Sequence, residues 1–431
     1  MSISHLLTHA CLSVTACTQP PADDAVHSAM SRTRGKGRIV GRLSALSRRT
    51  LLAITAVMLL AVRGASAQQY VLSPEPRTVI SSETDPSAQF SMLLGVARFA
   101  RGEIALATYD PLGMNVYNAG GALVKKLARA GEGPGELRMP QFLGRRQDSV
   151  VVFDLGLRRV TYFTVTGSVR QTRARLPQLK GHIPTVVGVM PSGALLVIQV
   201  PYTRPPSPDG PTRDRELLSI VPLDSAVPQV SLGTFAGYGL VYYTPPSEGE
   251  PHFLMDWLNP GTSWAVVGDN VFVADPSSPE LLMFAGNGKL MRRVSLPVKP
   301  RPFDPKAVRD AREQLAPRFF GARRARSAAR AAIDAAHFEL MFDVAKRPRT
   351  APYLRRLVRA TDGGVWVELY REHVGLPSEY LRIDASGRVG GRLRGPPNVQ
   401  FHEFGADYAL GVREDPETDA QSVVLYGLRR E

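Results

Sequence analysis

The chain has 431 residues, of which 44% are hydrophobic and 21% are charged, and this balance fits a globular protein with a hydrophobic core. Its net charge of +14 is uneven, because residues 1–67 hold eight Lys and Arg against two Asp, and residues 301–349 hold twelve against six acids. The remainder is close to neutral, so the basic composition does not predict a nucleic-acid-binding surface.

The first predicted element is an export leader at residues 1–67. Two arginines precede an apolar run, Leu51–Val62, and a small-residue site follows at Ala65–Ala67. We expect cleavage after Ala67 and an exported protein, periplasmic or extracellular. The apolar run is short for a bilayer, so no membrane span is expected after cleavage, and a retained anchor is the alternative. A basic stretch begins at Met30, as in a conventional export leader. We therefore expect that translation starts at Met30 and that residues 1–29 lie before the true start.

The export route stays open, since "SRRTLL" (47–52) resembles a twin-arginine signal and also fits the general secretory route. Both cysteines, Cys11 and Cys17, lie in the leader. We therefore expect a mature protein without disulfides, a thiol nucleophile or a cysteine metal site.

After the leader, six short segments repeat one pattern, a turn residue followed by a strand rich in apolar residues. They are "RGEIALAT" (101–108), "QDSVVVFD" (147–154), "PSGALLVI" (191–198), "GDNVFVAD" (268–275), "DGGVWVEL" (362–369) and "GADYALGV" (405–412). In the clearest repeats, a second apolar run, a glycine turn and a third strand follow. This order is typical of an antiparallel meander, the blade of a propeller.

The two ends of the repeat array predict how the ring closes. The last repeat offers only two or three strands, and "QYVLSPEPRTVI" (69–80) precedes the first repeat as an unassigned strand. A first strand that completes the last blade removes the free sheet edges. We expect an all-β, six-bladed propeller over 68–431.

Between the first two repeats lies "GEGPGEL" (131–137). A phosphate-binding loop needs free backbone N–H groups, but Pro134 removes one and Glu132 and Glu136 would repel an anion. We interpret the loop as a glycine-shaped crossover between blades, with a glutamate that accepts backbone N–H bonds.

This motif and the repeats resemble the secreted bacterial six-bladed β-propellers, which are related in architecture to NHL and TolB-type propellers. The G-x-G-P-G-E-F/L turn of that group matches residues 131–137, and the resemblance covers about residues 70–431. It implies the fold and export, but it implies no particular activity.

The longer intervals between repeats predict a loop insertion at 201–260. Its aromatic part supplies candidate ligand-binding residues, because flat faces with polar tips suit sugar or peptide recognition. These candidates are Tyr242, Tyr243, His252, Asp256 and Trp257. The alternative is that the aromatic side chains only anchor a long loop to the blade below.

A second insertion, at 304–345, is the one stretch predicted to be helical, with Asp304 as N-cap and Pro305 at the first helical position. We expect Ala329, Ala332 and Ala336 on its packed face. Asp334 and His337 would extend an exposed cationic stripe. Three arginines of that stripe are the candidate dock for a partner: Arg323, Arg326 and Arg330. The alternative is a solvated face without a partner.

The sequence contains no catalytic motif, since no G-x-S-x-G elbow and no histidine pair at ligand spacing follow the leader. We expect a monomeric binding module for a small ligand, a glycan or a protein partner such as an envelope protein, without a cofactor and without nucleic acid. One alternative is a lactonase-like propeller hydrolase or lyase with a divalent metal on the channel axis. Another is a scaffold subunit of a cell-envelope complex.

Overall fold

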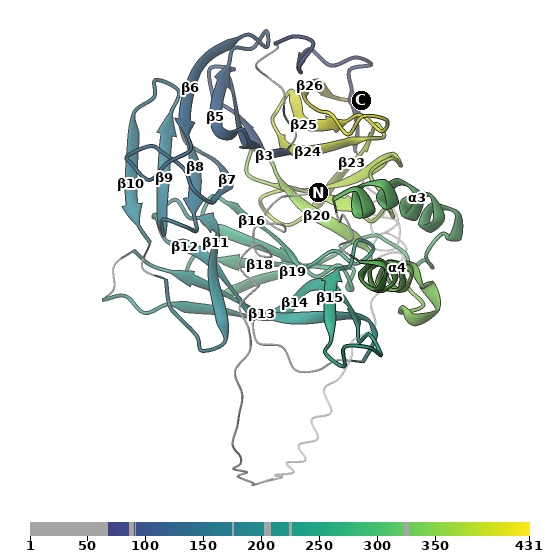
Figure 1. The fold of residues 1–431 in the computed structure, drawn as a ribbon. Helices are drawn as coiled ribbons and strands as arrows, with labels where there is room; N and C mark the ends of the chain where they lie inside the picture. Colours follow the sequence, from purple (N-terminus) through teal and green to yellow (C-terminus); the bar gives the residue numbers. More distant parts are fainter. Residues whose placement is uncertain are drawn as a thin grey trace, which may run out of the picture. The chain divides into compact units, whose positions relative to one another are not determined.

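Strands adjacent in sequence pair with one another, so the chain forms antiparallel meanders (Figure 1). The computed structural model describes residues 68–85, 90, 92–174, 176–201, 208–223, 226–322 and 327–431, which belong to one compact unit. The leader and its predicted cleavage site lie outside the described residues. Among the described residues, no helix is long and apolar enough to cross a membrane.

The first two sheets have four strands each. The first contains β3 (Met92–Arg98), β4 (Ile104–Asp110), β5 (Leu112–Tyr117) and β6 (Leu123–Arg129). The second contains β7 (Pro140–Arg146), β8 (Ser149–Asp154), β9 (Arg159–Thr164) and β10 (Val169–Arg173).

The third sheet has five strands and differs from the prediction. It contains β11 (His182–Val189), β12 (Leu195–Pro201), β13 (Gly210–Val221), β14 (Val230–Tyr243) and β15 (His252–Met255). Much of the predicted loop insertion at 201–260 is therefore strand, because alternating apolar residues in β13 and β14 continue the ladder. Residues 202–207 of that insertion lie outside the described residues.

The remaining strands form a four-stranded sheet and a nine-stranded sheet. The four-stranded sheet contains β16 (Ser263–Val267), β17 (Asn270–Ala274), β18 (Glu280–Ala285) and β19 (Leu290–Ser295). The nine-stranded sheet joins two meanders: β20 (Leu354–Arg359), β21 (Val365–Leu369), β22 (Ser378–Ile383) and β23 (Val389–Gly395), then β24 (Val399–Phe404), β25 (Tyr408–Glu414) and β26 (Gln421–Arg430), with β1 (Gln68–Leu72) and β2 (Thr78–Ile80).

The repeated segments of the sequence are confirmed as strands. Each overlaps the second strand of its meander, namely β4, β8, β12, β17, β21 or β25. The predicted closing strand is also confirmed, since β1 and β2 both pair antiparallel with β26. Strand β1 also pairs with β23, which is why the last two meanders form one sheet.

The first strands of successive meanders form a closed ring. Strand β3 contacts β7, and the contacts continue through β11, β16, β20 and β24 back to β3. Hydrophobic clusters lie between neighbouring sheets; one of them packs Ile104 and Leu106 against Leu410 and Leu425, which joins the first meander to the last. An array of meanders that closes around its inner strands is a β-propeller.

The glycine-rich turn at 131–137 is confirmed as a crossover, between β6 and β7. Glu136 accepts the backbone N–H of Gly133 at 2.8 Å and a bond from Nε of Arg129 at 2.9 Å. The N–H of Gly133 and then Arg129 lower the pKa of Glu136. Gly131 has a φ of 148°, and a Cβ there would collide with the Glu136 carboxylate.

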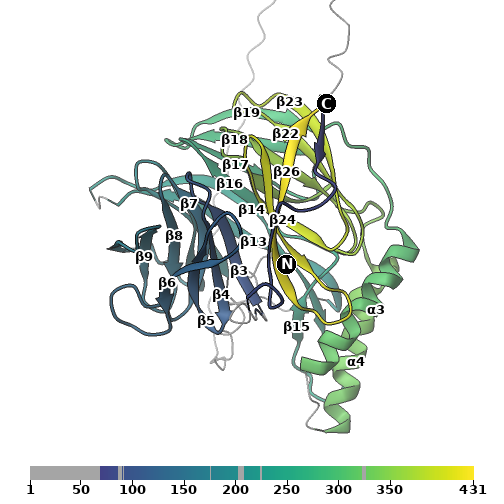
Figure 2. The ribbon, with the colours of Figure 1, turned by 90° about the horizontal axis from the view of Figure 1, so that it is seen from above.

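The helical insertion consists of two helices, α3 (Pro305–Ala322) and α4 (Ala328–Phe342), followed by a 3-10 turn at Val344–Lys346. The predicted N-cap is confirmed, because Asp304 accepts the N–H of Lys306 at 2.8 Å. Figure 2 shows α3 and α4 side by side next to β15, and α4 contacts β13 and β14.

The prediction of which face of α4 packs against the propeller is wrong. Ala329 and Ala332 are exposed, whereas Asp334 and His337 are buried with Phe338. His337 donates from Nε2 to the carbonyl of Val241 at 2.6 Å, which satisfies its buried ring nitrogen. The helix turns its aromatic side toward β14, because burying large apolar side chains outweighs burying alanines.

Replacing Tyr70 tests the ring closure. Its ring packs edge-on against Trp366 at 4.9 Å, and its hydroxyl accepts from Nε of Arg430 at 3.1 Å. Tyr70→Ala removes this buried ring and should lower the free energy of unfolding by about 3–5 kcal/mol. Tyr70→Phe keeps the ring and should cost about 1 kcal/mol. Urea unfolding measures both, and an alanine variant as stable as wild type would contradict the closing role of β1.

Candidate functional site

Three adjoining cavities follow the inner strands. The central cavity has a volume of about 190 Å³ and takes lining residues from all of the inner strands, from Val96 on β3 to Glu403 on β24. It shares Trp264, Arg356 and Leu357 with a cavity at one end, and Arg145 and Arg359 with a cavity at the other. Because neighbouring cavities share walls, we interpret them as one axial channel.

Interruptions of strand register shape this channel. The pairing of inner strands skips Leu143, Val187, Arg355 and His402, each of which lines a cavity. Such bulges add an unpaired residue to a strand and redirect side chains. The strands also approach closely, since a Cβ at Gly188 would lie 2.7 Å from Cγ2 of Val266.

The cavity at the end where the inner strands begin, which we call the mouth cavity, has a volume of about 200 Å³. Its wall combines aromatic, cationic and amide side chains. These include Tyr238, Trp257, Trp264, Arg355, Arg356 and Gln400. Trp257 is 36% exposed, so part of its ring is available to a ligand. This composition suits a small ligand with a flat face and a polar group.

The cavity at the opposite end is larger, about 610 Å³, and is also cationic. Arg145, Arg146 and Arg359 line it, together with Asp362. Asp362 pairs with Arg382 at 2.6 Å, and Arg359 pairs with Glu403 at 3.1 Å. No carboxylate among the described residues pairs with Arg145 or Arg146.

A buried carboxylate anchors the arginines near the mouth cavity. Glu368 is fully buried and pairs with Arg356 at 2.8 Å and with Arg371 at 3.0 Å. Burial alone would raise the pKa of Glu368, but Arg356, Arg371 and Arg355 lower it to about 2. Glu368 is therefore ionised at neutral pH and holds two guanidinium groups in place.

A second carboxylate, that of Glu403, also pairs with an arginine and accepts further hydrogen bonds. It accepts the Tyr408 hydroxyl at 2.6 Å, the Arg98 backbone N–H at 3.2 Å and Nη2 of Arg359 at 3.1 Å. Beside it, burial and then Arg356 hold the pKa of His402 well below its ordinary value, so its imidazole is neutral at neutral pH.

These contacts bear on the predicted alternative of a divalent metal on the axis. Among the described residues, no group of three or more His, Cys, Asp or Glu side chains is placed to hold a metal ion. The central cavity is lined by Arg145, Arg146, Arg356 and Arg359, whose charges repel a cation. Among the described residues, the side chains that line the central cavity therefore do not fit a divalent metal.

The five predicted ligand-binding residues are not gathered at one site. Asp256 and Trp257 line the mouth cavity, whereas Tyr243 lines a separate cavity against Phe342 of α4. Tyr242 is buried and packs on Phe253, and Nε2 of His252 pairs with Glu248.

Asp256 lines the mouth cavity, but its carboxylate is bound by the guanidinium group of Arg347. The two side chains form a buried bidentate pair, with both N–O distances 2.7 Å. This pair ties the end of the helical insertion to the segment after β15, so the two predicted insertions meet at this end of the channel. Asp256 thus has a structural role in positioning Trp257.

Two of the three predicted docking arginines, Arg323 and Arg326, lie outside the described residues. Arg330 lies on α4, with its side chain 40% exposed, and pairs with Asp334 at 3.3 Å. The docking hypothesis stays a prediction.

The sequence interpretation missed the arginines of the channel. Arg355 and Arg356 lie in "LRRLVR" (354–359), whose pattern is neither alternating nor glycine-flanked like the repeats. Paired arginines in an otherwise apolar strand were the available signal, because a buried strand rarely carries charge without a function or a partner.

No protein-family model matches the chain, and no curated protein matches it. Among solved structures, a member of the duf4221 family from Bacteroides vulgatus is 9% identical, with 85% of this chain and 99% of that chain covered and a TM-score of 0.45. A protein of Bacteroides fragilis is 13% identical, covering 86% and 97%, with a TM-score of 0.43. A gluconolactonase of Xanthomonas campestris is 13% identical, covering 86% and 99%, with a TM-score of 0.39. At these values the likenesses say nothing about what this chain binds or does.

Removing Asp256 tests its structural role. Asp256→Ala leaves Arg347 buried without a counter-charge and should lower the free energy of unfolding by about 3–5 kcal/mol. The double variant Asp256→Leu with Arg347→Met replaces the pair by apolar groups and should recover most of that loss. Urea unfolding compares them, and an unchanged stability of Asp256→Ala would refute the role.

The low pKa of Glu368 predicts a pH dependence. A carboxyl whose pKa is about 2 when folded and 4.5 in its ordinary state stabilises the fold above about pH 4.5, and this contribution fades as the pH falls toward 2. Glu368→Gln should therefore be least stable relative to wild type at neutral pH, and the difference should shrink as the pH falls from about 5 to about 2.

Urea unfolding at a series of pH values measures that difference. Glu379→Gln, which changes an exposed carboxylate on β22, is the matched control and should follow wild type throughout. A difference between Glu368→Gln and wild type that stays constant with pH would contradict the pKa assignment.

Proposed function

We propose that the mature chain is an exported, six-bladed β-propeller that binds a small ligand in the mouth cavity. The blades would be the meanders that begin at β3, β7, β11, β16, β20 and β24, with β1 completing the last. The observation that carries the binding site is the wall of the mouth cavity, where the half-exposed ring of Trp257 lies beside Tyr238, Trp264 and two arginines.

The position of this cavity supports the proposal. It adjoins the central cavity, and the segment after β15 and the helical insertion meet beside it through Asp256 and Arg347. Loops and insertions carried on a rigid ring are a common place for binding residues. The mouth cavity is therefore bordered by packed elements.

Binding fits the polar groups better than acid–base catalysis does. The carboxylates of the described residues that line the three channel cavities are Asp256, Asp362 and Glu403, and each is paired with an arginine. A carboxylate whose oxygens already accept hydrogen bonds from an arginine is less available to exchange a proton with a ligand. Their pairing with arginines favours a role in binding and in shaping the cavities.

Tryptophan fluorescence tests the proposal, because two of the three tryptophans line the mouth cavity. We expect that at least one member of a panel of sugars, sugar acids and cyclic carboxylates shifts the emission and raises the melting temperature. Trp257→Ala should weaken that ligand about tenfold, since it removes an aromatic face.

Tyr109→Ala is the matched control, because Tyr109 is 40% exposed and lies on β4 away from the cavity. It should bind the same ligand with wild-type affinity. A panel in which no member binds, or a Trp257→Ala variant that binds like wild type, would refute this site.

A further inference from the structure

A bulge brings two consecutive arginines to the mouth cavity. In a regular strand, neighbouring side chains point to opposite faces, so Arg355 and Arg356 would not share a cavity. The pairing of β20 with β21 passes from Leu354 directly to Arg356 and leaves Arg355 unpaired in the ladder. Both arginines consequently line the mouth cavity.

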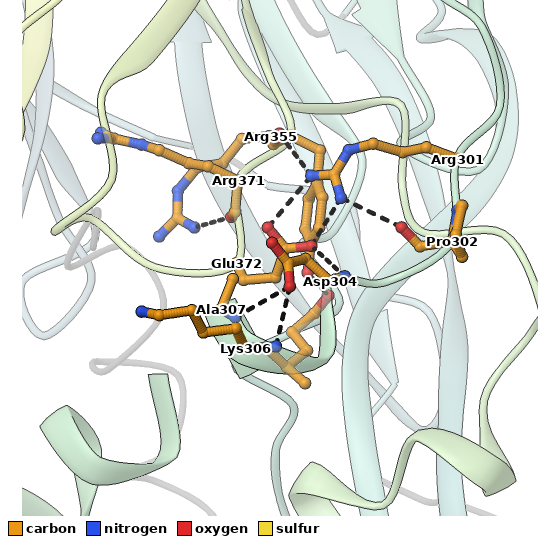
Figure 3. A network of polar contacts seen from close by, with 10 residues as sticks. Arg301, Pro302, Asp304, Lys306, Ala307, Arg355, Arg371 and Glu372 are labelled. Atoms are coloured by element: carbon orange, nitrogen blue, oxygen red, sulfur yellow. Dashed lines mark hydrogen bonds and ion pairs between the residues drawn. The ribbon is translucent and has the colours of Figure 1, made fainter. Parts of the chain in front are cut away.

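The positive charge beside this cavity exceeds the negative charge. Three guanidinium groups, those of Arg355, Arg356 and Arg371, surround Glu368, which pairs with only the last two. The nearby Glu372 is held by Arg301 at 2.7 Å. Figure 3 shows Arg301 reaching Glu372, while the side chains of Arg355 and Arg371 extend away from it.

The three arginines differ in how their donors are used. Arg371 donates to the carbonyls of Val374 and Val399 besides Glu368, and Arg356 donates to Glu368 and to a backbone carbonyl. Arg355 makes one long bond, from Nη1 to the carbonyl of Arg371 at 3.4 Å. It has no ion pair among the described residues, so most of its five N–H donors are available.

The surroundings of Arg355 penalise its charge. Burial is the main cause of its lowered pKa, and Arg371 and Arg356 add to the effect against the opposing charge of Glu368. A bound anion would relieve this penalty. The same wall holds Thr262, which is 5% exposed and whose hydroxyl has no hydrogen-bond partner within the described part of the chain. A buried polar group without a partner calls for one, and a ligand can supply it.

The remaining wall defines the rest of the ligand. Tyr238, Trp257 and Trp264 offer aromatic surface, and the volume of about 200 Å³ admits a single ring with its substituents. A guanidinium binds a carboxylate through two parallel N–H bonds. We infer that the mouth cavity binds a carboxylate attached to a single ring, with Arg355 as its main charged contact and the aromatic side chains against the ring. This inference rests on the proposed function.

Calorimetric titration with matched probes tests the ligand class. The probes are D-galacturonate and cyclohexanecarboxylate, their neutral counterparts D-galactose and cyclohexanemethanol, and acetate, which lacks a ring. At least one cyclic acid should bind at least tenfold more tightly than its neutral counterpart and than acetate. Which cyclic acid binds distinguishes a sugar acid from an apolar ring.

Arg355→Gln tests the residue. It should weaken the cyclic acid about ten- to hundredfold, as expected for loss of a charged hydrogen-bond donor. It should also raise the melting temperature of the unliganded protein by about 1–3 °C, because it removes uncompensated charge. Arg394→Gln, an exposed arginine on β23, is the matched control and should change neither value.

The outcomes separate the two proposals. If no probe binds, the proposed function fails and the ligand class fails with it. If a neutral ring or acetate binds as tightly as the cyclic acids, the cavity binds ligands but the carboxylate assignment is overturned. If Arg355→Gln lowers the stability of the unliganded protein, Arg355 is a structural residue, and the assignment is overturned even without a ligand.

Discussion

Backbone pairing between the first and the last strands that the structure describes is the constraint on which the rest of this structure depends. Strand β1 pairs with β26 and also with β23, so residues near position 70 join strands more than three hundred positions away. This closure brings the last meander against the first, where Ile104 and Leu410 share one hydrophobic cluster. Once the ring is closed, the inner strands converge, and the side chains on those strands line a common channel.

Convergence explains why the channel is polar and why its charges are paired. Bulges in the converging inner strands turn additional side chains toward the axis. Several arginines of the inner strands line the channel, and buried carboxylates pair with two of them, since Glu368 pairs with Arg356 and Glu403 pairs with Arg359. A buried charge destabilises the fold unless it is paired, so Arg355, which has no ion pair among the described residues, is expected to destabilise the unliganded protein.

The helical insertion contributes through one end of the channel. Its aromatic side packs on β14, and its last residues place Arg347 against Asp256. Trp257 directly follows Asp256, so this buried pair holds the backbone next to the tryptophan. The partly exposed Trp257 side chain thus forms part of the wall of the mouth cavity. The insertion therefore defines the mouth of the channel without supplying many of the residues that line it.

Local pattern determined the repeated strands, the glycine turn at 131–137 and the start of α3, because each depends on neighbours within a few residues. The closing strand was predicted from the missing strand of the last repeat, since its pairing joins distant parts of the chain. Tertiary structure alone decided which side chains face the axis. The bulge at Arg355 depends on register with β21, and the Asp256–Arg347 pair joins residues 91 positions apart. The buried side of α4 was likewise set by the sheet that covers it, so Asp334 and His337 lie inside although their spacing with Arg330 predicted an exposed stripe. Contacts between distant segments have no local signature in the sequence, and the channel of this protein is built from such contacts.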